Sequence, residues 1–242
     1  MAISEYTTLL AFAVLAPLGL AFAHSRDQRL FSAALLIAGS AMLAGRAAYV
    51  LIHWEYFSEH RAEVIGFAGL SEHGAIAGGM AAYLILRRVI RPPLAYLGSL
   101  CSTAFVLVAA AASLGCIEAG CAYGREVFWQ TDGEASLAWQ LRVDWPDAYQ
   151  VRNPRWPTQV LMAAWMAGCG LVLWLAKART PEVLAPCFAI GDFGWQFLRG
   201  DPAALLGPFR VYQWFDLIFI VISALCAISF MSRPNRVTLN SR

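Results

Sequence analysis

Residues 69–79 read GLSEHGAIAGG and open an apolar stretch that continues to Leu86. His73 therefore lies where the chain is expected to enter a membrane. The preceding apolar stretch contains Arg46 within the sequence AGRAAYV. An ionisable side chain at membrane depth costs about 2.5 kcal/mol or more, so by default it marks a functional site with a partner. These two residues predict both a membrane protein and the region of its site.

The composition agrees with a membrane protein. Of 242 residues, 59% are hydrophobic and 14% are charged, whereas a soluble domain carries about a quarter charged residues. A helix that crosses a bilayer needs about 20 mostly apolar residues. We therefore expect an all-α polytopic membrane protein with about seven transmembrane helices. The candidate segments are residues 8–22, 30–53, 73–86, 94–114, 158–176, 183–198 and 211–230.

The basic residues predict the orientation of these helices. Ten of the 18 basic residues follow the first, third, fifth and seventh segments, so they share one side of the membrane. Because cytoplasmic loops are enriched in Lys and Arg, we expect the N-terminus outside and the C-terminus in the cytoplasm. The ten residues are Arg26, Arg29, Arg87, Arg88, Arg91, Lys177, Arg179, Arg233, Arg236 and Arg242.

The first segment ends in a sequence, AFA at residues 21–23, that resembles a signal-peptidase site. A signal peptide has a positively charged region before its apolar run. Residues 1–8 carry Glu5 and no basic residue. We therefore expect this segment to remain as an anchor.

The chain is expected to form a single domain over residues 1–242, because no internal repeat or low-complexity tract divides it. Its longest polar segment, at about residues 115–157, lies on the outward side in the predicted topology. The inward loops are short by comparison. We therefore expect substrates to be met from the outer face.

Four cationic or titratable residues fall near outward span ends: Arg46, His73, Arg125 and Arg199. We expect them to point into one outward-facing cavity near the membrane surface, as the handling of an outer-leaflet phospholipid requires. The alternatives are structural. Arg125 and Arg199 fit boundary residues that extend to water, and Arg46 fits a buried ion pair.

Glycines surround His73, and they permit two interpretations. Gly69, Gly74, Gly78 and Gly79 allow close backbone approach and leave amide groups open to an anion. Because Gly74 and Gly78 are four residues apart, they also fit the packing of two helices through small residues. The two interpretations are compatible.

Several motifs in order resemble the prolipoprotein diacylglyceryl transferase family. The stretches AGRAAYV and GLSEHGA resemble the family patterns G-x-R-x-x-Y-V and G-G-L-S-x-H-G-G. Residues 115–125 resemble the signature after the fourth span, and Pro157-Thr158-Gln159 resembles the P-[ST]-Q that enters the next. Residues 197–202, FLRGDP, resemble F-F-R-x-P-D, and Tyr212-Gln213-Trp214 resembles the G-Q-W of the last helix.

The resemblance implies an integral protein of the bacterial plasma membrane. It implies transfer of a diacylglyceryl group from phosphatidylglycerol to the cysteine thiol of a lipoprotein precursor, without a cofactor, metal or nucleic acid. His73, Arg46 and Tyr49 are then the expected catalytic residues. The expected substrate-binding residues are Gly74, Gly78, Gly79, Arg125, Gln159, Arg199 and Gln213.

That chemistry has clear requirements. The nucleophile is a thiolate, so a thiol must lose its proton. Charge that develops on the departing phosphate needs cations or amide groups. His73 could act as the base or as a hydrogen-bond donor to phosphate, and arginine side chains suit phosphate oxygens because of their forked geometry.

The chain also departs from the family pattern. The signature's leading arginine falls at Ser113, its asparagine at Cys116 and its glutamate at Cys121. A further arginine falls at Asp192, and the nearby glutamate falls at Gln196. The second glycine after the histidine is Ala75, and the residues after P-[ST]-Q include Leu161 and Met162 in place of tyrosine and glutamate.

Cys116 and Cys121 lie on the outward side, where an oxidising compartment permits a disulfide. A free pair in this glycine-rich segment fits equally well. A metal site on these two thiols would need two further ligands, with only His73 expected nearby, so none is expected.

Three functions fit the sequence. The first is a lipid-handling transferase of the family. The second is a protein of the same fold that binds lipid or a partner without catalysis, as Ser113 and Asp192 suggest. The third is a seven-span receptor or transporter. A retinal pigment does not fit, because the only lysine, Lys177, lies in an inward loop. Inverted repeats of the transporter kind are not visible.

Overall fold

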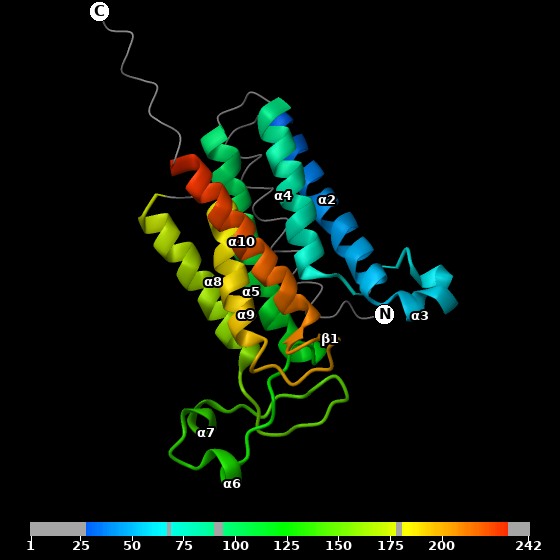
Figure 1. Ribbon diagram of the computed structural model, residues 1–242, viewed down its shortest axis with the longest axis vertical. Coiled ribbons are helices and arrows are strands. Elements are labelled where there is room, and N and C mark those ends of the chain that lie inside the picture. The colour runs from blue at the N-terminus through cyan, green and yellow to red at the C-terminus, as the bar shows by residue number, and fades with distance from the viewer. Residues whose placement is uncertain (1–27, 67–68, 90–93, 178–180, 232–242) are drawn as a thin grey trace, which may run out of the picture.

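The computed structural model describes residues 28–66, 69–89, 94–177 and 181–231, which are mostly helical (Figure 1). The long helices are α2 (Gln28–Ile52), α4 (Glu72–Val89), α5 (Leu94–Ala119), α8 (Thr158–Leu175), α9 (Pro181–Trp195) and α10 (Val211–Met231). The short elements are α3 (Trp54–Glu59), η1 (Arg61–Glu63), α6 (Trp129–Asp132), α7 (Leu137–Leu141), β1 (Leu205–Leu206) and β2 (Phe209–Arg210).

Six of the seven segments predicted as spans are helices in the structure, with bounds that shift by at most five residues. The segment predicted at residues 8–22 lies outside the described residues. Among those described, α2, residues Leu97–Ala119 of α5, and α8 are long and apolar enough to cross a membrane. Residues Val211–Leu225 of α10 form a shorter apolar helix.

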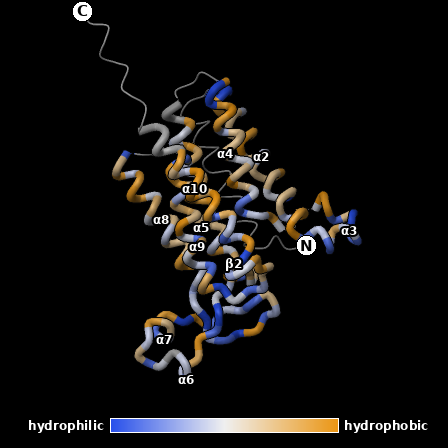
Figure 2. Tube along the Cα trace, viewed as in Figure 1, coloured by the Kyte–Doolittle hydropathy of each residue, from blue (hydrophilic) through white to orange (hydrophobic). Residues whose placement is uncertain are grey.

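The outer surface of the bundle is apolar along the helices (Figure 2). Large hydrophobic side chains such as Leu43 on α2, Val172 on α8 and Ile222 on α10 are more than half exposed. A continuous apolar surface of this kind is unfavourable in water. It is the surface expected of helices that contact lipid tails.

Helices α2 and α4 pack closely because glycines face small residues. A Cβ atom added at Gly78 would lie 2.3 Å from Ala44 Cβ and 2.6 Å from the Ser40 carbonyl oxygen. One added at Gly74 would lie 2.5 Å from Ala48 Cβ. Interfaces between membrane helices often use small residues in this way. The glycines therefore fix the distance between these two helices.

The other long helices form the second part of the bundle, in which α5 packs on α8, α8 on α9 and α9 on α10. Met162 and Met166 of α8 meet Phe188 of α9 in a buried cluster, and Phe105 of α5 packs against it. The Trp165 indole N–H donates to the Cys187 carbonyl at 2.8 Å. These contacts hold α9 at a fixed place beside α8.

Residues 115–157 lie at one end of the bundle and carry α6 and α7 (Figure 1). Arg155 anchors this polar segment. Its Nη2 lies 3.0 Å from Glu126 Oε1 and 3.0 Å from Asp147 Oδ2, and its guanidinium lies over the Tyr123 ring. Arg155 and Asp147 are each 6% exposed. The segment therefore has an ionic core of its own.

A disulfide joins Cys116 and Cys121 at the junction between α5 and this segment. Helix α5 ends at Ala119, and Gly120 follows with a φ of +64°. A residue in this left-handed conformation is the common way to end a helix, and glycine adopts it without strain. The sequence alone allowed either a disulfide or a free cysteine pair, and the structure contains the disulfide.

Several basic residues share one end of the bundle. Figure 1 shows the start of α2 and the ends of α4, α8 and α10 at the end opposite residues 115–157. Arg87 and Arg88 lie in the last turn of α4, and Lys177 follows α8. Which side of the membrane this end faces stays a prediction. Arg26, Arg91, Arg179 and the basic residues of the C-terminal tail lie outside the described residues.

Candidate functional site

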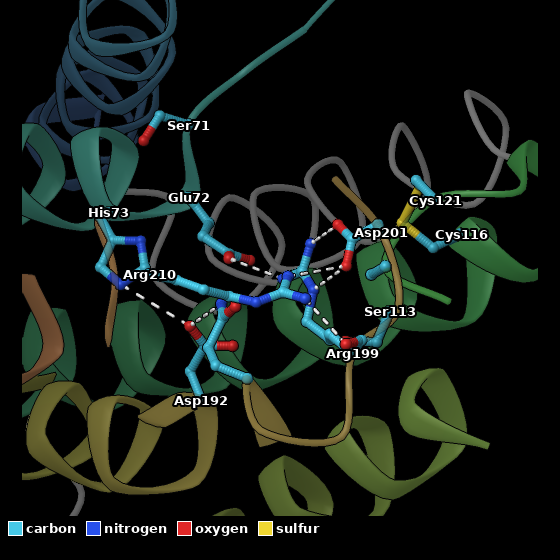
Figure 3. Close-up of polar contacts among 12 residues, drawn as sticks. Ser71, Glu72, His73, Ser113, Cys116, Cys121, Asp192, Arg199, Asp201 and Arg210 are labelled. Atoms are coloured by element: carbon cyan, nitrogen blue, oxygen red, sulfur yellow. Dashed lines mark hydrogen bonds and ion pairs between the residues drawn. A yellow bond between two sulfur atoms is a disulfide. The ribbon is translucent and has the colours of Figure 1, made fainter. Parts of the chain in front are cut away.

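His73 lies in the first turn of α4, at the same end of the bundle as residues 115–157 (Figure 3). Ser71 starts this turn, because its Oγ accepts a hydrogen bond from Gly74 N at 3.3 Å and its carbonyl accepts one from Ala75 N at 3.0 Å. Capping of this kind fixes a helix start. His73 is only 4% exposed. Its ring lies among the side chains of Phe188, Tyr212, Phe215 and Phe219.

Two carboxylates approach the same nitrogen of His73. Nε2 lies 2.8 Å from Asp216 Oδ1 of α10 and 3.8 Å from Asp192 Oδ2 of α9. Nε2 and Asp216 Oδ1 share a hydrogen bond, in which Nε2 is the donor when the carboxylate is ionised. Asp192 in turn accepts a hydrogen bond from Gln196 Nε2 at 2.9 Å. Three helices therefore bring an imidazole and two buried carboxylates together.

Arg199 and Arg210 share the carboxylate of Asp201 beside this group (Figure 3). Arg199 Nε and Nη2 donate to Asp201 at 2.9 and 2.5 Å, and Arg210 Nη1 donates at 3.1 Å. Arg210 Nη2 also donates to the Arg199 carbonyl at 2.8 Å. Glu72 Oε1 lies 3.9 Å from Arg199 Nη1 and links this network to His73, its neighbour in the chain.

The ionisation of Asp201 reflects its partners. Burial alone would raise its pKa, because it penalises the charged form. The hydrogen bonds and positive charges of Arg199 and Arg210 outweigh burial and hold the pKa of Asp201 below its ordinary value of 3.8. The carboxylate is therefore charged at neutral pH and keeps both guanidiniums in place.

Arg46 and Tyr49 lie on α2, beside the connection that leads into α4. Arg46 donates to the carbonyls of Val64 at 2.9 Å and Gly69 at 3.0 Å, and also to the Glu63 carbonyl. Its guanidinium lies 5.7 Å from the centre of the Tyr49 ring. A Cβ atom added at Gly69, where φ is +83°, would lie 2.4 Å from that ring. These residues thus hold the connection between η1 and α4.

The structure brings two of the predicted cavity residues together. His73 and Arg199 are linked through Glu72, whereas Arg46 donates to backbone carbonyls of the connection before α4. The Arg125 side chain is exposed, and its backbone N–H donates to the Leu198 carbonyl at 2.7 Å. One cavity lined by Arg46, His73, Arg125 and Arg199 stays a prediction.

The other predicted binding residues make structural contacts. Gly74 and Gly78 meet α2 closely, and a Cβ at Gly79 would lie 3.3 Å from Ala41 Cβ. Gln159 Nε2 donates to the Cys121 carbonyl at 3.1 Å. Gln213 accepts from Arg210 N at 2.9 Å and donates to the Phe193 carbonyl at 3.2 Å. These contacts position the disulfide-bonded turn and the β1–β2 hairpin around a cluster of ionisable side chains that we call the charged group. Its members are Glu72, His73, Asp192, Arg199, Asp201, Arg210 and Asp216.

Comparison with known proteins identifies the family. The family model described as prolipoprotein diacylglyceryl transferase matches residues 1–229. The chain belongs to this family.

Two curated relatives show how the family resembles this chain. A phosphatidylglycerol–prolipoprotein diacylglyceryl transferase of Acaryochloris marina is 30% identical over 198 residues, which cover 76% of this chain and 69% of that protein. Phosphatidylglycerol–prolipoprotein diacylglyceryl transferase 2 of Clostridium perfringens is 26% identical over 207 residues, which cover 82% of this chain and 77% of that protein. Membership of this family therefore accounts for the apolar segments, without a receptor or transporter function.

Within this diacylglyceryl transferase fold, two of the positions that depart from the family pattern lie beside His73. Asp192 lies against His73 and receives the Gln196 amide. Ser113, where the pattern has an arginine, donates its hydroxyl to the Ala109 carbonyl of its own helix at 2.8 Å. At Asp192, the site therefore carries a carboxylate where the pattern has a cation.

Five residues of the charged group were not predicted as site residues from the sequence: Glu72, Asp192, Asp201, Arg210 and Asp216. Asp216 carried a usable signal, because an acidic residue inside an apolar segment is costly without a partner. Asp201 and Arg210 carried none, because charged residues are ordinary in a polar connection between helices.

Proposed function

We propose that this chain is a membrane-bound transferase that moves a diacylglyceryl group from phosphatidylglycerol to the cysteine thiol of a lipoprotein precursor. Membership of the diacylglyceryl transferase family supports the reaction class. The observation that carries the proposal is the group at the outward end of the bundle, where the buried imidazole of His73 lies beside carboxylates and two arginines.

The proposed reaction forms one bond and breaks one. The cysteine sulfur attacks the glycerol carbon that is bonded to the phosphate oxygen. A C–S bond forms, the C–O bond breaks, and glycerol phosphate leaves with the electron pair. The thiol proton passes to the group of carboxylates and imidazole around His73. Loss of that proton is necessary because the thiol is a poor nucleophile.

Arg199 and Arg210 supply the positive charge for the departing phosphate. Both are mostly buried, with side chains 15% exposed, and both are held by Asp201. Fixed guanidiniums stabilise developing negative charge without having to reorganise during the reaction. Their forked shape also suits phosphate oxygens.

We further propose the topology in full: one domain over residues 1–242, about seven spans, N-terminus outside and C-terminus in the cytoplasm of a bacterial plasma membrane. Reporter fusions after Arg91 and after Arg242 should behave as cytoplasmic, and a fusion after Asp132 as external. A C-terminal fusion that reports an external position would overturn this orientation.

Transfer of labelled diacylglyceryl from phosphatidylglycerol to a lipobox peptide tests the function, with purified protein in nanodiscs. The wild-type protein should transfer the label, and His73→Ala should lower the rate by about a hundredfold or more, the usual contribution of a proton-transferring side chain. His60→Ala is the matched control, because His60 is exposed on the α3–η1 connection.

A second arm tests the substituted arginine position. Ser113→Arg should raise the rate with phosphatidylglycerol if missing positive charge limits phosphate binding. The absence of transfer by both the wild-type protein and Ser113→Arg, together with retained lipid binding, would favour the non-catalytic lipid-binding function instead.

A further inference from the structure

We infer that Glu72, His73 and Asp192 form a binding site for a divalent cation of the zinc class. A carboxylate oxygen of Glu72, a ring nitrogen of His73 and a carboxylate oxygen of Asp192 all lie within 4.8 Å of one another. Ligand atoms around one zinc ion lie about 3–4 Å apart. A rotation of the half-exposed Glu72 side chain would have to close that difference.

Carboxylates outnumber cationic side chains around His73. If all four are ionised, Glu72, Asp192, Asp201 and Asp216 supply four negative charges, whereas Arg199 and Arg210 supply two positive ones. Even a protonated His73 leaves one negative charge in excess. Unpaired buried charge is costly, so such charges are paired or bind metal ions. A divalent cation would supply the missing charge.

A second observation, independent of the three ligands, points to the same ion. Asp216 is fully buried, and its Oδ2 has no hydrogen-bond partner among the described residues. Gln196 Oε1, also buried, lacks one there too. Both side chains point into the cluster, because Asp216 contacts His73 and Gln196 contacts Asp192. Buried acceptor oxygens without a donor need a proton, a water molecule or a cation.

One nitrogen of the His73 ring is left for a ligand. Nε2 lies 2.8 Å from Asp216 Oδ1, and the buried Nδ1 has no hydrogen-bond partner within the described part of the chain. A histidine that binds a metal with one nitrogen commonly donates the other N–H to a carboxylate. Imidazole with carboxylates suits zinc and neighbouring first-row ions. Three protein ligands leave a position open for a substrate atom.

The test measures metal content and so does not depend on transferase activity. Protein purified in detergent without chelator should contain about one equivalent of a first-row divalent metal per chain by mass spectrometry. After chelation, added Zn²⁺ should restore that content, and Co²⁺ should give visible absorption bands. Asp192→Asn and His73→Asn should each weaken Zn²⁺ binding by at least tenfold.

Two further variants make the result specific. Asp216→Asn should weaken Zn²⁺ binding by about 10–100-fold, because it removes the carboxylate that orients His73. Asp144→Asn should bind as the wild-type protein does, because Asp144 is an exposed carboxylate of the outward segment. Wild-type protein that takes up no metal after incubation with Zn²⁺, Mn²⁺ or Co²⁺ would overturn the inference, whatever the variants do.

The result separates this inference from the proposed function. Transfer without bound metal would leave the transferase in place and mean that protons neutralise the cluster. Bound metal without transfer would support the cation site and count against the reaction.

Discussion

The two halves of the bundle use their polar and small residues differently. In the α2–α4 half, the glycines after His73 pack against α2, and Arg46 binds backbone carbonyls of the connection before α4. In the α9–α10 half, Asp192 and Asp216 meet His73, and Arg199 is held by Asp201. The stretch that most resembles the family thus builds the frame, whereas the stretch that departs from it supplies most of the charges.

This difference explains how a diacylglyceryl transferase fold can be kept while its site changes. Close helix packing tolerates almost no added volume, so the residues that fix it are restricted. At the end of the bundle, by contrast, the choice of a charged side chain is restricted only by the need for a partner of opposite charge. Replacement of an arginine by Asp192 requires new partners, and Gln196 supplies one of them.

The largest expected effect is loss of the fold on Gly78→Leu. The first added carbon atom alone would overlap Ala44 and the Ser40 carbonyl, and the backbone cannot move away without separating α2 from α4. The overpacking penalty, typically about 1–3 kcal/mol, is exceeded where the contact is with backbone. We expect aggregated protein by size-exclusion chromatography and no resistance to protease.

Gly168→Leu is the matched control for that substitution. Gly168 lies on α8, and nothing lies within 4 Å of an added Cβ there. This variant should purify as the wild-type protein does. Equal behaviour of the two leucine variants would mean that α2 and α4 do not depend on close packing at Gly78.

The sequence predicted the frame better than the site, for physical reasons. Apolar length and helix-ending residues are local, so the predicted bounds of six helices are confirmed. The partners of His73 come from residues 192 and 216, far along the chain. No local pattern specifies which of several buried acidic residues will face one histidine. The glycines illustrate the opposite case, because their four-residue spacing predicted the helix packing that the structure contains.

A smaller effect is expected for Asp201→Asn in the α9–α10 half. The change leaves Arg199 and Arg210, both largely buried, without their shared carboxylate. Loss of one partner from a buried ion pair typically costs about 3–5 kcal/mol, and partial exposure here favours the lower end. Hydrogen exchange should become faster at residues 199–213, while exchange in α2 and α4 should not change. Asp144→Asn serves as the exposed control.

The same carboxylate sets a pH dependence. The pKa of Asp201 is lower in the folded protein than its ordinary value of 3.8. A lowered pKa contributes stability that is fully present above the ordinary value and is lost as pH falls through the folded value. Protection at residues 199–213 should therefore persist from neutral pH to about pH 4 and decline only at lower pH. A decline that begins near pH 6 would contradict the assignment.

The smallest expected effect is local and belongs to the α2–α4 half. Arg46 holds three backbone carbonyls of residues 63–69, and a lysine ammonium cannot match the spread of a guanidinium over all three. Hydrogen bonds from a charged group contribute about 1.5–3 kcal/mol each where they are buried. Arg46→Lys should therefore cost about 2 kcal/mol locally. Faster hydrogen exchange should be confined to residues 60–71.

Arg61→Lys is the comparison for this substitution, because Arg61 is exposed and its side chain donates a long 3.4 Å hydrogen bond to the Ser58 carbonyl. Its exchange should match that of the wild-type protein. If Arg46→Lys instead left the exchange of residues 60–71 unchanged but slowed lipid transfer, Arg46 would act on substrate as the sequence alone predicted. Both halves of the bundle would then contribute residues to the site. Arg46 would belong to the site and not only to the packing of α2 and α4.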